Sequence, residues 1–326
     1  MNITVMKFGG TSVADPEKIQ RAAARAIAEK KRGKAVVVVV SAPGEMTDEL
    51  LTLSSRVSKS PSPREKDQLI TTGEIVGVSL FAMSCLDQGA EAVSLSAAQA
   101  GIEASGSYGS ADISRLNPSR ILRELKNGKI VVVAGFQGIN AEKDVLSLGR
   151  GGSDLTAIDL ASRLKAKECV IFSDVRGIYT ADPRMVAKAR ILKTISLLDM
   201  IELSRFGSQV MQFRSLEIAK KYGIPIQLRS AFHMDLGTLI VAHPKEENKA
   251  PVTALAFEKK DNQALISAIG PFAHLSPEIK ERIVSELQRK KIKIISVQKG
   301  FRRLSFSVRP SDGEIALASA HRACRL

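Results

Sequence analysis

The sequence has too few cysteines for a disulfide framework. Its 326 residues include three, Cys85, Cys169 and Cys324, which lie far apart and form no C-x-x-C pair. An odd number of widely spaced cysteines argues against both disulfides and a structural zinc site, and it is typical of a reducing compartment. We therefore expect a cytoplasmic protein, with no metal site built from its own side chains.

Long apolar runs are also missing. The most continuous aliphatic stretch, residues 36–40, is far shorter than the ~20 residues that cross a bilayer. Met1 leads almost directly into a strand-like stretch at residues 3–6, without the basic and apolar regions of a signal peptide. These absences predict a chain with no membrane span and no membrane partner.

Aromatic residues are scarce, although the chain is strongly basic. They make up 4% of the residues and tryptophan is absent, while the formal net charge is +14. A basic chain either binds nucleic acid or a membrane, or carries a solvated surface that also favours small anionic ligands. Because basic and aromatic residues do not interleave as nucleic-acid binding requires, we favour the second interpretation and expect no nucleic-acid partner.

What is present indicates an α/β fold. Continuously apolar stretches at residues 3–6, Ala35–Val40, Ile130–Ala134 and 169–172 alternate with helical patterns at Pro16–Lys31, 65–86, 118–126 and 154–164. Uninterrupted apolar strands are typical of parallel sheets that are covered on both faces. The alternation predicts a three-layer α/β/α sandwich with a largely parallel sheet. Asp15 and Asn117 are the expected N-caps of two helices that open with Pro16 and Pro118.

The chain is long enough for a second domain. Residues 243–251 are polar and flanked by prolines, as in a linker. Beyond them we expect strands at residues 252–257, 264–269, 292–297 and 304–308, with helices at 277–291 and 312–322. This order predicts a small α+β ferredoxin-like module. We therefore divide the chain into domains at residues 1–243 and 252–326.

The four apolar strands of the first domain all end in glycine-rich polar loops. Ligands of open α/β sheets bind beyond the carboxyl ends of the strands, so four such loops together suggest a site. The first loop, from Lys7 to Ser12, has the backbone N–H groups and the cation that phosphates need, but a Gly-Gly turn is more often structural. The loop from Ser173 to Arg184 is compatible with nucleotide binding or with an irregular surface.

Two further features carry charge beside glycines. In the run from Gly149 to Asp154, Arg150 precedes an expected helix start, where exposed N–H groups attract anions. The alternative is that Ser153 or Asp154 caps the helix. Glu74 follows Gly73 inside an expected helix, where a glycine costs about 1 kcal/mol relative to alanine. Such a glycine indicates close approach by another group, and Glu74 is either an ammonium partner or a solvated carboxylate.

Together these segments resemble the aspartate kinases of the amino acid kinase superfamily. The matching stretches are KFGGTSV from Lys7, SAPGEMTDELL from Ser41, TTGE from Thr71, VVAGFQG from Val132, LGRGGSD from Leu148, SDVRGIYTADPR from Ser173 and PIQLRS from Pro225. Each motif is weak alone, but their order and spacing agree with the family over roughly residues 1–241. The module after residue 252 resembles a shortened ACT-type region, which would also mediate a homodimer.

The resemblance implies transfer of the γ-phosphate of ATP, with Mg²⁺, to the side-chain carboxylate of L-aspartate. It also implies a place in lysine, threonine and methionine biosynthesis. Lys7 and Asp154 would be catalytic. The residues implied for ATP are Lys7, Phe8, Gly9, Gly10, Ser12, Ser173, Asp174, Tyr179, Asp182 and Arg184. Those implied for aspartate are Ser41, Thr47, Glu74, Arg150, Gly151, Gly152 and Ser153.

Elementary chemistry refines the role of Asp154. An aspartate side chain has a pKa near 3.9 in water, so the attacking carboxylate is already ionised and needs no general base. The obstacle is its repulsion by the phosphates, which alignment and charge neutralisation must overcome. We therefore expect Asp154 to orient Lys7 or the metal ion rather than to remove a proton.

Two departures from the family pattern keep other functions open. Gln209 stands where many members carry lysine, and the region after residue 252 has room for about one ACT-type module, which puts feedback inhibition in doubt. The alternatives are a kinase for another small carboxylate or carbamate and a non-catalytic nucleotide or amino acid sensor. Lys7, Arg150 and Asp154 favour the aspartate kinase.

Overall fold

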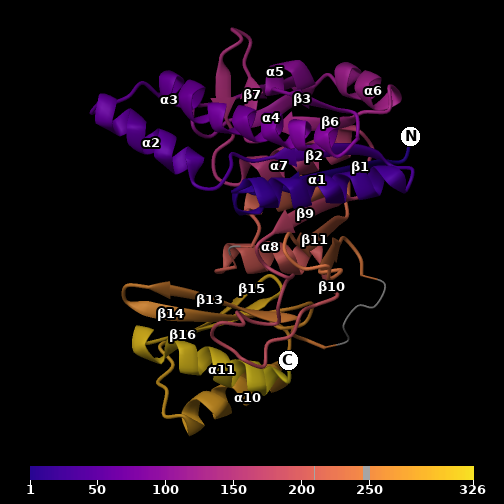
Figure 1. Ribbon diagram of the computed structural model, residues 1–326. Coiled ribbons are helices and arrows are strands. Elements are labelled where there is room, and N and C mark those ends of the chain that lie inside the picture. Colours follow the sequence, from indigo (N-terminus) through magenta and orange to yellow (C-terminus); the bar gives the residue numbers. More distant parts are fainter. Residues whose placement is uncertain (209, 245–249) are drawn as a thin grey trace. The chain divides into compact units, whose positions relative to one another are not determined.

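The computed structural model describes residues 1–208, 210–244 and 250–326, which form two compact units (Figure 1). The first unit comprises Met1–Arg176 and Glu217–Asp235. The second comprises Gly177–Leu216 and Leu236–Leu326. The chain therefore enters the second unit at Gly177, returns to the first unit at Glu217 and enters the second unit again at Leu236.

A parallel sheet of six strands forms the centre of the first unit. In spatial order its strands are β11 (Ile226–Ser230), β9 (Cys169–Ser173), β1 (Ile3–Phe8), β2 (Ala35–Val40), β6 (Ile130–Ala134) and β3 (Ala92–Leu95). Each neighbouring pair is parallel. The central strands are almost wholly buried because their apolar side chains are covered on both faces. The predicted parallel sheet is confirmed.

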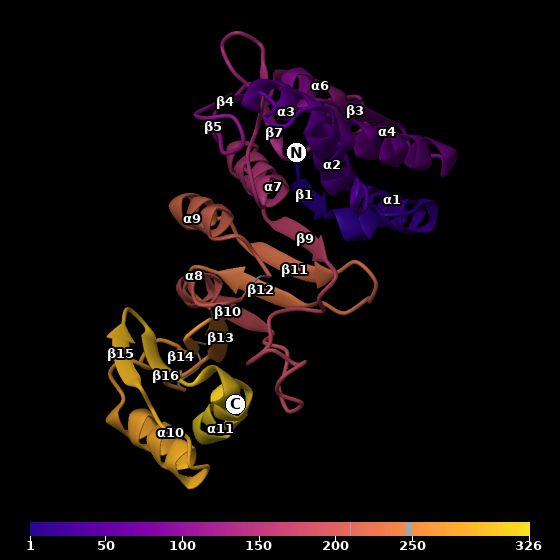
Figure 2. The ribbon, with the colours of Figure 1, turned by 90° about the vertical axis from the view of Figure 1, so that its left-hand side faces the viewer.

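Helices cover both faces of this sheet. Helices α1 (Pro16–Lys31) and α4 (Thr72–Asp87) pack against Phe8 and Phe172, whose rings stack with centroids 4.5 Å apart. Helix α7 (Gly152–Arg163) lies on the opposite side of β1 from α1, as Figure 2 shows. As predicted, Asp15 caps α1 by accepting a hydrogen bond from the Lys18 amide, with Pro16 as the first helical residue. The predicted three-layer sandwich is confirmed.

Shorter elements complete the first unit. A second sheet runs in the order β5 (Asp112–Leu116), β4 (Ile102–Ser105), β7 (Gln137–Ile139) and β8 (Val145–Ser147). The remaining elements are the 3₁₀ turn η1 (Gly10–Val13) and helices α2 (Met46–Val57), α3 (Pro63–Ile70), α5 (Ala97–Ala100) and α6 (Ser119–Lys126), while α9 (Phe213–Tyr222) spans the boundary between the units.

Several sequence-based boundaries were wrong. The expected helix at residues 65–86 is two helices, α3 and α4, which meet at Thr71. Helix α6 begins at Ser119, one residue late, although the Asn117 side chain still accepts a hydrogen bond from the Ser119 amide. The sheet of β4, β5, β7 and β8 was missed because its strands are only three to five residues long and partly polar.

The second unit contains the predicted ferredoxin-like module. Its antiparallel sheet has the order β13 (Ala254–Lys260), β14 (Gln263–Ile269), β16 (Arg303–Val308) and β15 (Ser296–Gly300). Helices α10 (Pro277–Arg289) and α11 (Gly313–Cys324) lie side by side against this sheet and share a core with Phe306 (Figure 2). Strand β15 begins four residues later than expected, although the Ile295 amide just before it already donates a hydrogen bond to the Ser307 carbonyl of β16 at 2.8 Å.

The rest of the second unit consists of Gly177–Leu216 and the chain from Leu236 to the start of β13. It contains the parallel strands β10 (Thr194–Ser196) and β12 (Thr238–Val241) and helix α8 (Leu197–Arg205). The 3₁₀ turn η2 (Pro310–Asp312) belongs to the ferredoxin-like module and precedes α11. The buried Asp199 of α8 accepts hydrogen bonds from Arg302 and from Thr253 at 2.7 and 3.0 Å. Helix α8 is thereby fixed to the ferredoxin-like module.

One helical run in the described part of the chain, Pro63–Asp87, is long and apolar enough to cross a membrane by length and composition alone. Half of its most apolar window is buried inside the protein. The core helix of a globular fold meets the same criterion. Gly77 in this run is buried against the loop after β2.

We expect Gly77→Ala to destabilise the protein by about 1–3 kcal/mol. A Cβ at this position would lie 2.6 Å from the Ser41 carbonyl oxygen. Helix propensity alone predicts the opposite sign, because alanine is favoured over glycine by about 1 kcal/mol. Urea unfolding is the measurement, and Ser79→Ala on the outer side of the same helix is the control. Equal or greater stability of Gly77→Ala would show that the contact relaxes freely.

Candidate functional site

The carboxyl ends of β9, β1, β2 and β6 meet at one edge of the parallel sheet, as the sequence predicted. The four strands are consecutive neighbours in the order given above. Backbone hydrogen bonds join the loops that follow them. Ser41 donates to the Phe8 carbonyl at 3.1 Å, Gly44 to Gly10 at 3.0 Å, and Gly135 to Val40 at 3.1 Å. The first three glycine-rich loops therefore form one connected surface.

The Lys7 side chain lies on this surface and pairs with Asp154. Its Nζ is 2.6 Å from a carboxylate oxygen of Asp154, and both side chains are almost buried. Lys7 belongs to β1 and Asp154 to the first turn of α7, so the pair joins the sheet to the helix N-terminus. The pairing fixes the position of the Lys7 ammonium group relative to α7.

The Gly9-Gly10 turn brings backbone close to the lysine. A Cβ on Gly9 would lie 3.3 Å from the Lys7 Nζ, and one on Gly10 would lie 2.9 Å from the Ala42 carbonyl oxygen. Only glycine permits the second approach without a shift of the backbone. Ser12 is buried beside this turn, and its hydroxyl has no hydrogen-bond partner in the described residues. A buried hydroxyl without a partner is suited to an oxygen-rich ligand.

Helix α7 begins two residues earlier than predicted. Its N-cap is Gly151, with φ of +71°, and no side chain caps the helix. The alternative that Ser153 or Asp154 is the cap is therefore wrong, since both lie in the first turn. Gly152 packs within reach of Phe136 and Leu148, where a Cβ would lie 2.9 Å from each. The first N–H groups of α7 are thus left without a side-chain cap.

Arg150 and Ser153 flank this helix start. The Arg150 side chain is exposed and has no ion-pair partner within the described ranges. Ser153 is buried against Gly135, where a Cβ would lie 2.6 Å from the serine hydroxyl. An unpaired guanidinium at the N-terminus of a helix is a favourable place for a carboxylate.

Glu74 is buried, so it is not the solvated glutamate that was one alternative. It is 2% exposed, and one carboxylate oxygen accepts a hydrogen bond from the Ala42 amide at 3.0 Å. The other oxygen has no partner among the described residues. Burial raises the pKa of Glu74 to about 7, and the Ala42 hydrogen bond only partly opposes this. The unpaired oxygen is suited to a cationic group.

The loop after β2 lies close to Gly73, which confirms the expectation that another group approaches this glycine. A Cβ on Gly73 would lie 2.8 Å from the Ala42 Cβ. Ser41 and Thr47, the other residues expected to hold the acceptor, are half-buried at either end of this loop. Glu74, Ser41 and Ala42 are therefore held together by close backbone contact.

Asp67 was not predicted from the sequence, although it fixes the chain that precedes Arg150. Asp67 is fully buried and accepts hydrogen bonds from the Ser147 amide and hydroxyl, both at 2.8 Å, and from the Gly109 amide at 2.9 Å. A signal was present, because Asp67, Ile70 and Glu74 recur at helical spacing on one buried face. The bonds to Ser147 fix the chain three residues before Arg150.

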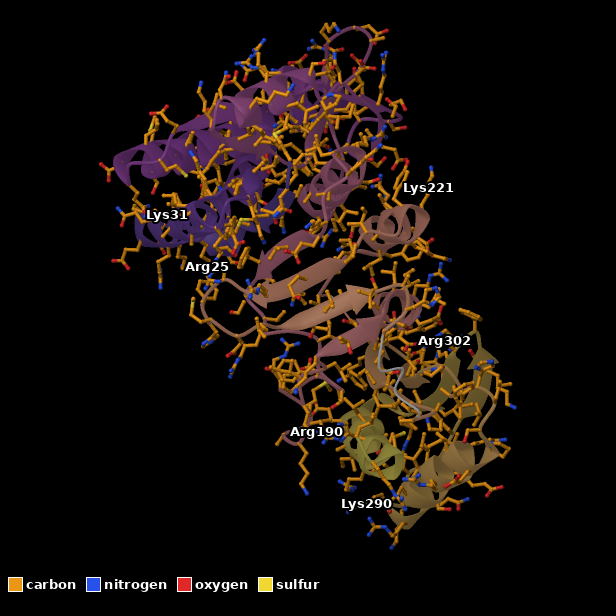
Figure 3. The ribbon with its side chains drawn as sticks, turned by 90° about the vertical axis from the view of Figure 1, so that its right-hand side faces the viewer. Arg25, Lys31, Arg190, Lys221, Lys290 and Arg302 are labelled. Carbon is orange, nitrogen blue, oxygen red and sulfur yellow. The ribbon has the colours of Figure 1, made fainter. Side chains whose placement is uncertain are left out.

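Arg25 was also missed. Its guanidinium lies over the Phe172 ring at 5.1 Å and donates hydrogen bonds to the carbonyl oxygens of Ser230 and Ala231. Figure 3 labels Arg25. The Ala231 amide in turn donates to the Ser173 carbonyl at 2.8 Å. Arg25 therefore supports Ser173, one of the residues expected at the nucleotide. The Ser173 hydroxyl donates to the exposed Asp174 at 2.9 Å.

The remaining nucleotide candidates belong to the second unit. Tyr179 forms an isolated bridge with Ile191. Arg184 is exposed and donates hydrogen bonds to both carboxylate oxygens of Asp182, which holds the pKa of Asp182 below its usual value. Gln209 lies outside the described residues.

Comparison with known proteins identifies the family. Residues 2–230 match the model of the amino acid kinase family. The chain belongs to the amino acid kinase family. Within it, the curated proteins that the chain resembles are aspartokinases. It is 47% identical to Aspartokinase 2 of Bacillus subtilis over 82% of this chain and 65% of that protein. It is 40% identical to the aspartokinase of Corynebacterium glutamicum over 97% of this chain and 77% of that protein.

A solved structure agrees. The aspartate kinase from Synechocystis has a TM-score of 0.68 and 28% identity, covering 99% of this chain and 69% of that chain. The chain thus spans slightly less than two thirds of the length of the first curated relative. The family resemblance stated from the motifs is confirmed.

The raised pKa of Glu74 predicts a pH dependence of stability. Between about pH 4.5 and 7 the folded protein retains a proton on Glu74 that the unfolded chain releases. The contribution of Glu74 to the free energy of unfolding therefore falls by up to about 3 kcal/mol as the pH rises from about 4.5 to 7. Above about pH 7 this contribution no longer changes. Glu74→Gln stays neutral and keeps an acceptor for the Ala42 amide.

Urea unfolding of the unsubstituted protein and of Glu74→Gln between pH 4.5 and 8 measures the effect. The difference between their free energies of unfolding isolates Glu74, because the other titrating groups contribute equally to both. We expect Glu74→Gln to gain stability relative to the unsubstituted protein as the pH rises to 7. Parallel curves would show that Glu74 titrates normally.

Proposed function

We propose that this chain is an aspartate kinase, which transfers the γ-phosphate of ATP to the side-chain carboxylate of L-aspartate to give 4-phospho-L-aspartate. The observation that carries the proposal is the Lys7–Asp154 pair beside the Gly9-Gly10 turn, at the edge where four parallel strands end. A carboxylate oxygen attacks the γ-phosphorus. The bond from that phosphorus to the bridging oxygen breaks, and ADP leaves with the electron pair.

The residues at the end of β1 fit the phosphates of a nucleotide. The Lys7 ammonium, the backbone of Gly9 and Gly10 and the unpaired Ser12 hydroxyl offer donors without a bulky side chain between them. Mg²⁺ in kinases is held mainly by phosphates and water with one or two carboxylates. Asp154 would supply one such carboxylate, and the described residues contain no cluster of three or more metal-ligating side chains. When bound, the metal ion neutralises charge on the phosphates.

Ser173 and Asp174 at the end of β9, with Tyr179, Asp182 and Arg184, are proposed to hold the rest of the nucleotide. Their support is the family match, which includes all five residues. Asp182 and Arg184 already pair with each other, which fixes the guanidinium for an anionic partner.

The other side of the site fits a free amino acid. Glu74 offers an unpaired buried oxygen to the α-ammonium group. Arg150 and the uncapped start of α7, with Gly151, Gly152 and Ser153, offer donors to the α-carboxylate. Ser41 and Thr47 would bind the remaining polar atoms. A substrate needs both an ammonium and a carboxylate to satisfy this set, which favours an α-amino acid over a simple carboxylate or a carbamate.

Catalysis would arise from alignment and charge rather than from proton abstraction. The acceptor carboxylate is ionised at neutral pH. Lys7 and the N–H groups of α7 lower the repulsion between this carboxylate and the phosphates. Asp154 holds Lys7 in place through the ion pair, and the nearly buried position strengthens this contact relative to water.

A non-catalytic sensor is the second candidate, and Gln209 is the observation that favours it, because a lysine is common there in the family. The intact Lys7–Asp154 pair favours the kinase.

For the kinase we further propose the first step of lysine, threonine and methionine biosynthesis in the cytoplasm. We also propose a homodimer through the ferredoxin-like module, whose edge strand β15 exposes Val297 next to Ile295.

Hydroxylamine trapping tests the proposed reaction. With MgATP and L-aspartate the protein should give aspartyl hydroxamate, because hydroxylamine captures acyl phosphates, and L-glutamate should give none. Lys7→Ala should lose at least a hundredfold in rate, as expected when a preorganised charge at the transferred group is removed. MgATP binding without hydroxamate would support the sensor, and Gln209→Lys would then be the first variant to assay.

The role of Asp154 predicts a separate result. Asp154→Asn keeps the shape but weakens the hold on Lys7, so kcat should fall while the pH dependence of kcat/KM keeps its form. Asp159→Asn, one turn further along α7 and paired with Arg163, is the matched control. An ionisation present in the unsubstituted protein but missing in Asp154→Asn would instead identify Asp154 as a general base.

A further inference from the structure

The segment that carries Tyr179, Asp182 and Arg184 is built into the same compact unit as the ferredoxin-like module. Ala181 and Val186 of this segment belong to the buried cluster that also contains Phe306 of β16 and Ala320 of α11. The apolar side chains of the segment are therefore part of the module's core. Tyr179, Asp182 and Arg184 are left at least partly exposed.

Thr180 is the point where the segment is most firmly attached. It is 3% exposed, and every polar atom that it has is bonded. Its amide donates to the Arg190 carbonyl at 2.9 Å, and its own carbonyl accepts from the Leu255 amide of β13 at 2.8 Å. Its hydroxyl oxygen accepts from the Arg190 amide at 3.0 Å. Arg190 is labelled in Figure 3.

The fourth bond of Thr180 reaches helix α11. The Nε2 atom of His321 lies 2.9 Å from the Thr180 hydroxyl oxygen, and His321 is 2% exposed. Because the hydroxyl already accepts from Arg190, its proton is free to be donated to a neutral imidazole. Burial lowers the pKa of His321, as do the charges of Arg190 from the facing segment and Arg322 from its own helix. The lowered pKa favours the neutral ring, whose Nε2 can accept the Thr180 proton.

The sequence context makes the bond unusual. Thr180 and His321 are 141 residues apart in the sequence, and both are buried. A buried hydrogen-bonded pair costs stability when one member is removed, since the other is left unsatisfied. A pair of apolar side chains would fill the space without that cost. The bond therefore specifies a position rather than merely adding stability.

We propose that His321 is a positioning residue, which holds Thr180 and thereby keeps the segment from Tyr179 to Arg184 in its nucleotide-binding conformation. The inference rests on the proposed function, because the segment's role toward ATP belongs to that proposal. It assigns the last helix of the ferredoxin-like module a direct effect on nucleotide affinity. That effect requires neither a bound amino acid effector nor a second ACT-type module.

Variants on both sides of the bond test the proposal in the full chain. His321→Ala and Thr180→Val remove one partner each, while His321→Gln and Thr180→Ser keep a polar group for the other. Ile283→Ala is the control, because it opens a cavity in the same core from α10 without touching the bond. The measurements are the Kd for MgATP by calorimetry, the KM for each substrate, and amide hydrogen exchange of the ligand-free protein.

We expect His321→Ala and Thr180→Val to raise the Kd and KM for ATP by about tenfold, with the KM for aspartate unchanged. His321→Gln and Thr180→Ser should recover most of the affinity. The amides of Thr180 and Leu255 should exchange faster in the two disruptive variants than in Ile283→Ala. An effect on ATP no larger than that of Ile283→Ala, or one shared equally by both substrates, would overturn the proposal.

Failure of the proposed function gives a different pattern. If the unsubstituted protein binds no MgATP, the nucleotide role of the segment is wrong, and the positioning role toward ATP is overturned with it. If the unsubstituted protein binds MgATP and the two disruptive variants bind it equally well, the proposed function stands and only the role of His321 is overturned.

Discussion

The ion pair between Lys7 and Asp154 is the contact on which the proposed site depends. It joins the central strand of the parallel sheet to the first turn of α7, and it does so where little water reaches either group. Removing two charges from water is costly, so the pair is weak evidence for stability. The role of the ion pair is to position the Lys7 ammonium group. It sets where an ammonium group stands relative to the Gly9-Gly10 turn.

Close backbone approach is the second constraint. At Gly10, Gly73, Gly77 and Gly135, a Cβ would lie less than 3 Å from an atom of a neighbouring element. These contacts let three strand-end loops and the start of α4 share a small volume. The side chains placed there, above all Glu74, are consequently held by the backbone of other elements and have little freedom to adjust. A site of this kind is assembled before its ligands arrive, which lowers the entropy lost on binding.

The sequence predicted what local patterns encode. Strands β2 and β6 were predicted with correct bounds, because an unbroken apolar run between polar loops has few other interpretations. The start of α7 was misplaced because Gly151 caps it through a positive φ, which leaves no capping side chain to recognise. Asp67 and Arg25 were missed for another reason. Each binds groups distant in sequence. Helical spacing could indicate that Asp67 is buried, but it could not identify Ser147 as its partner or Ser230 as the partner of Arg25. The partners of Glu74 likewise required the fold.

The electrostatics of Glu74 connect the fold to substrate choice. A buried carboxyl with a pKa near 7 is only partly ionised at neutral pH, because no cation in the described structure compensates its desolvation. An α-ammonium group beside the free oxygen would stabilise the ionised form and lower that pKa. Under the proposed function, substrate binding would then be coupled to the release of a proton. A carboxylate without an ammonium group would leave Glu74 uncompensated and would add a like charge to the site. The same burial that disfavours the ionised form of Glu74 would thereby favour an α-amino acid over a simple dicarboxylate.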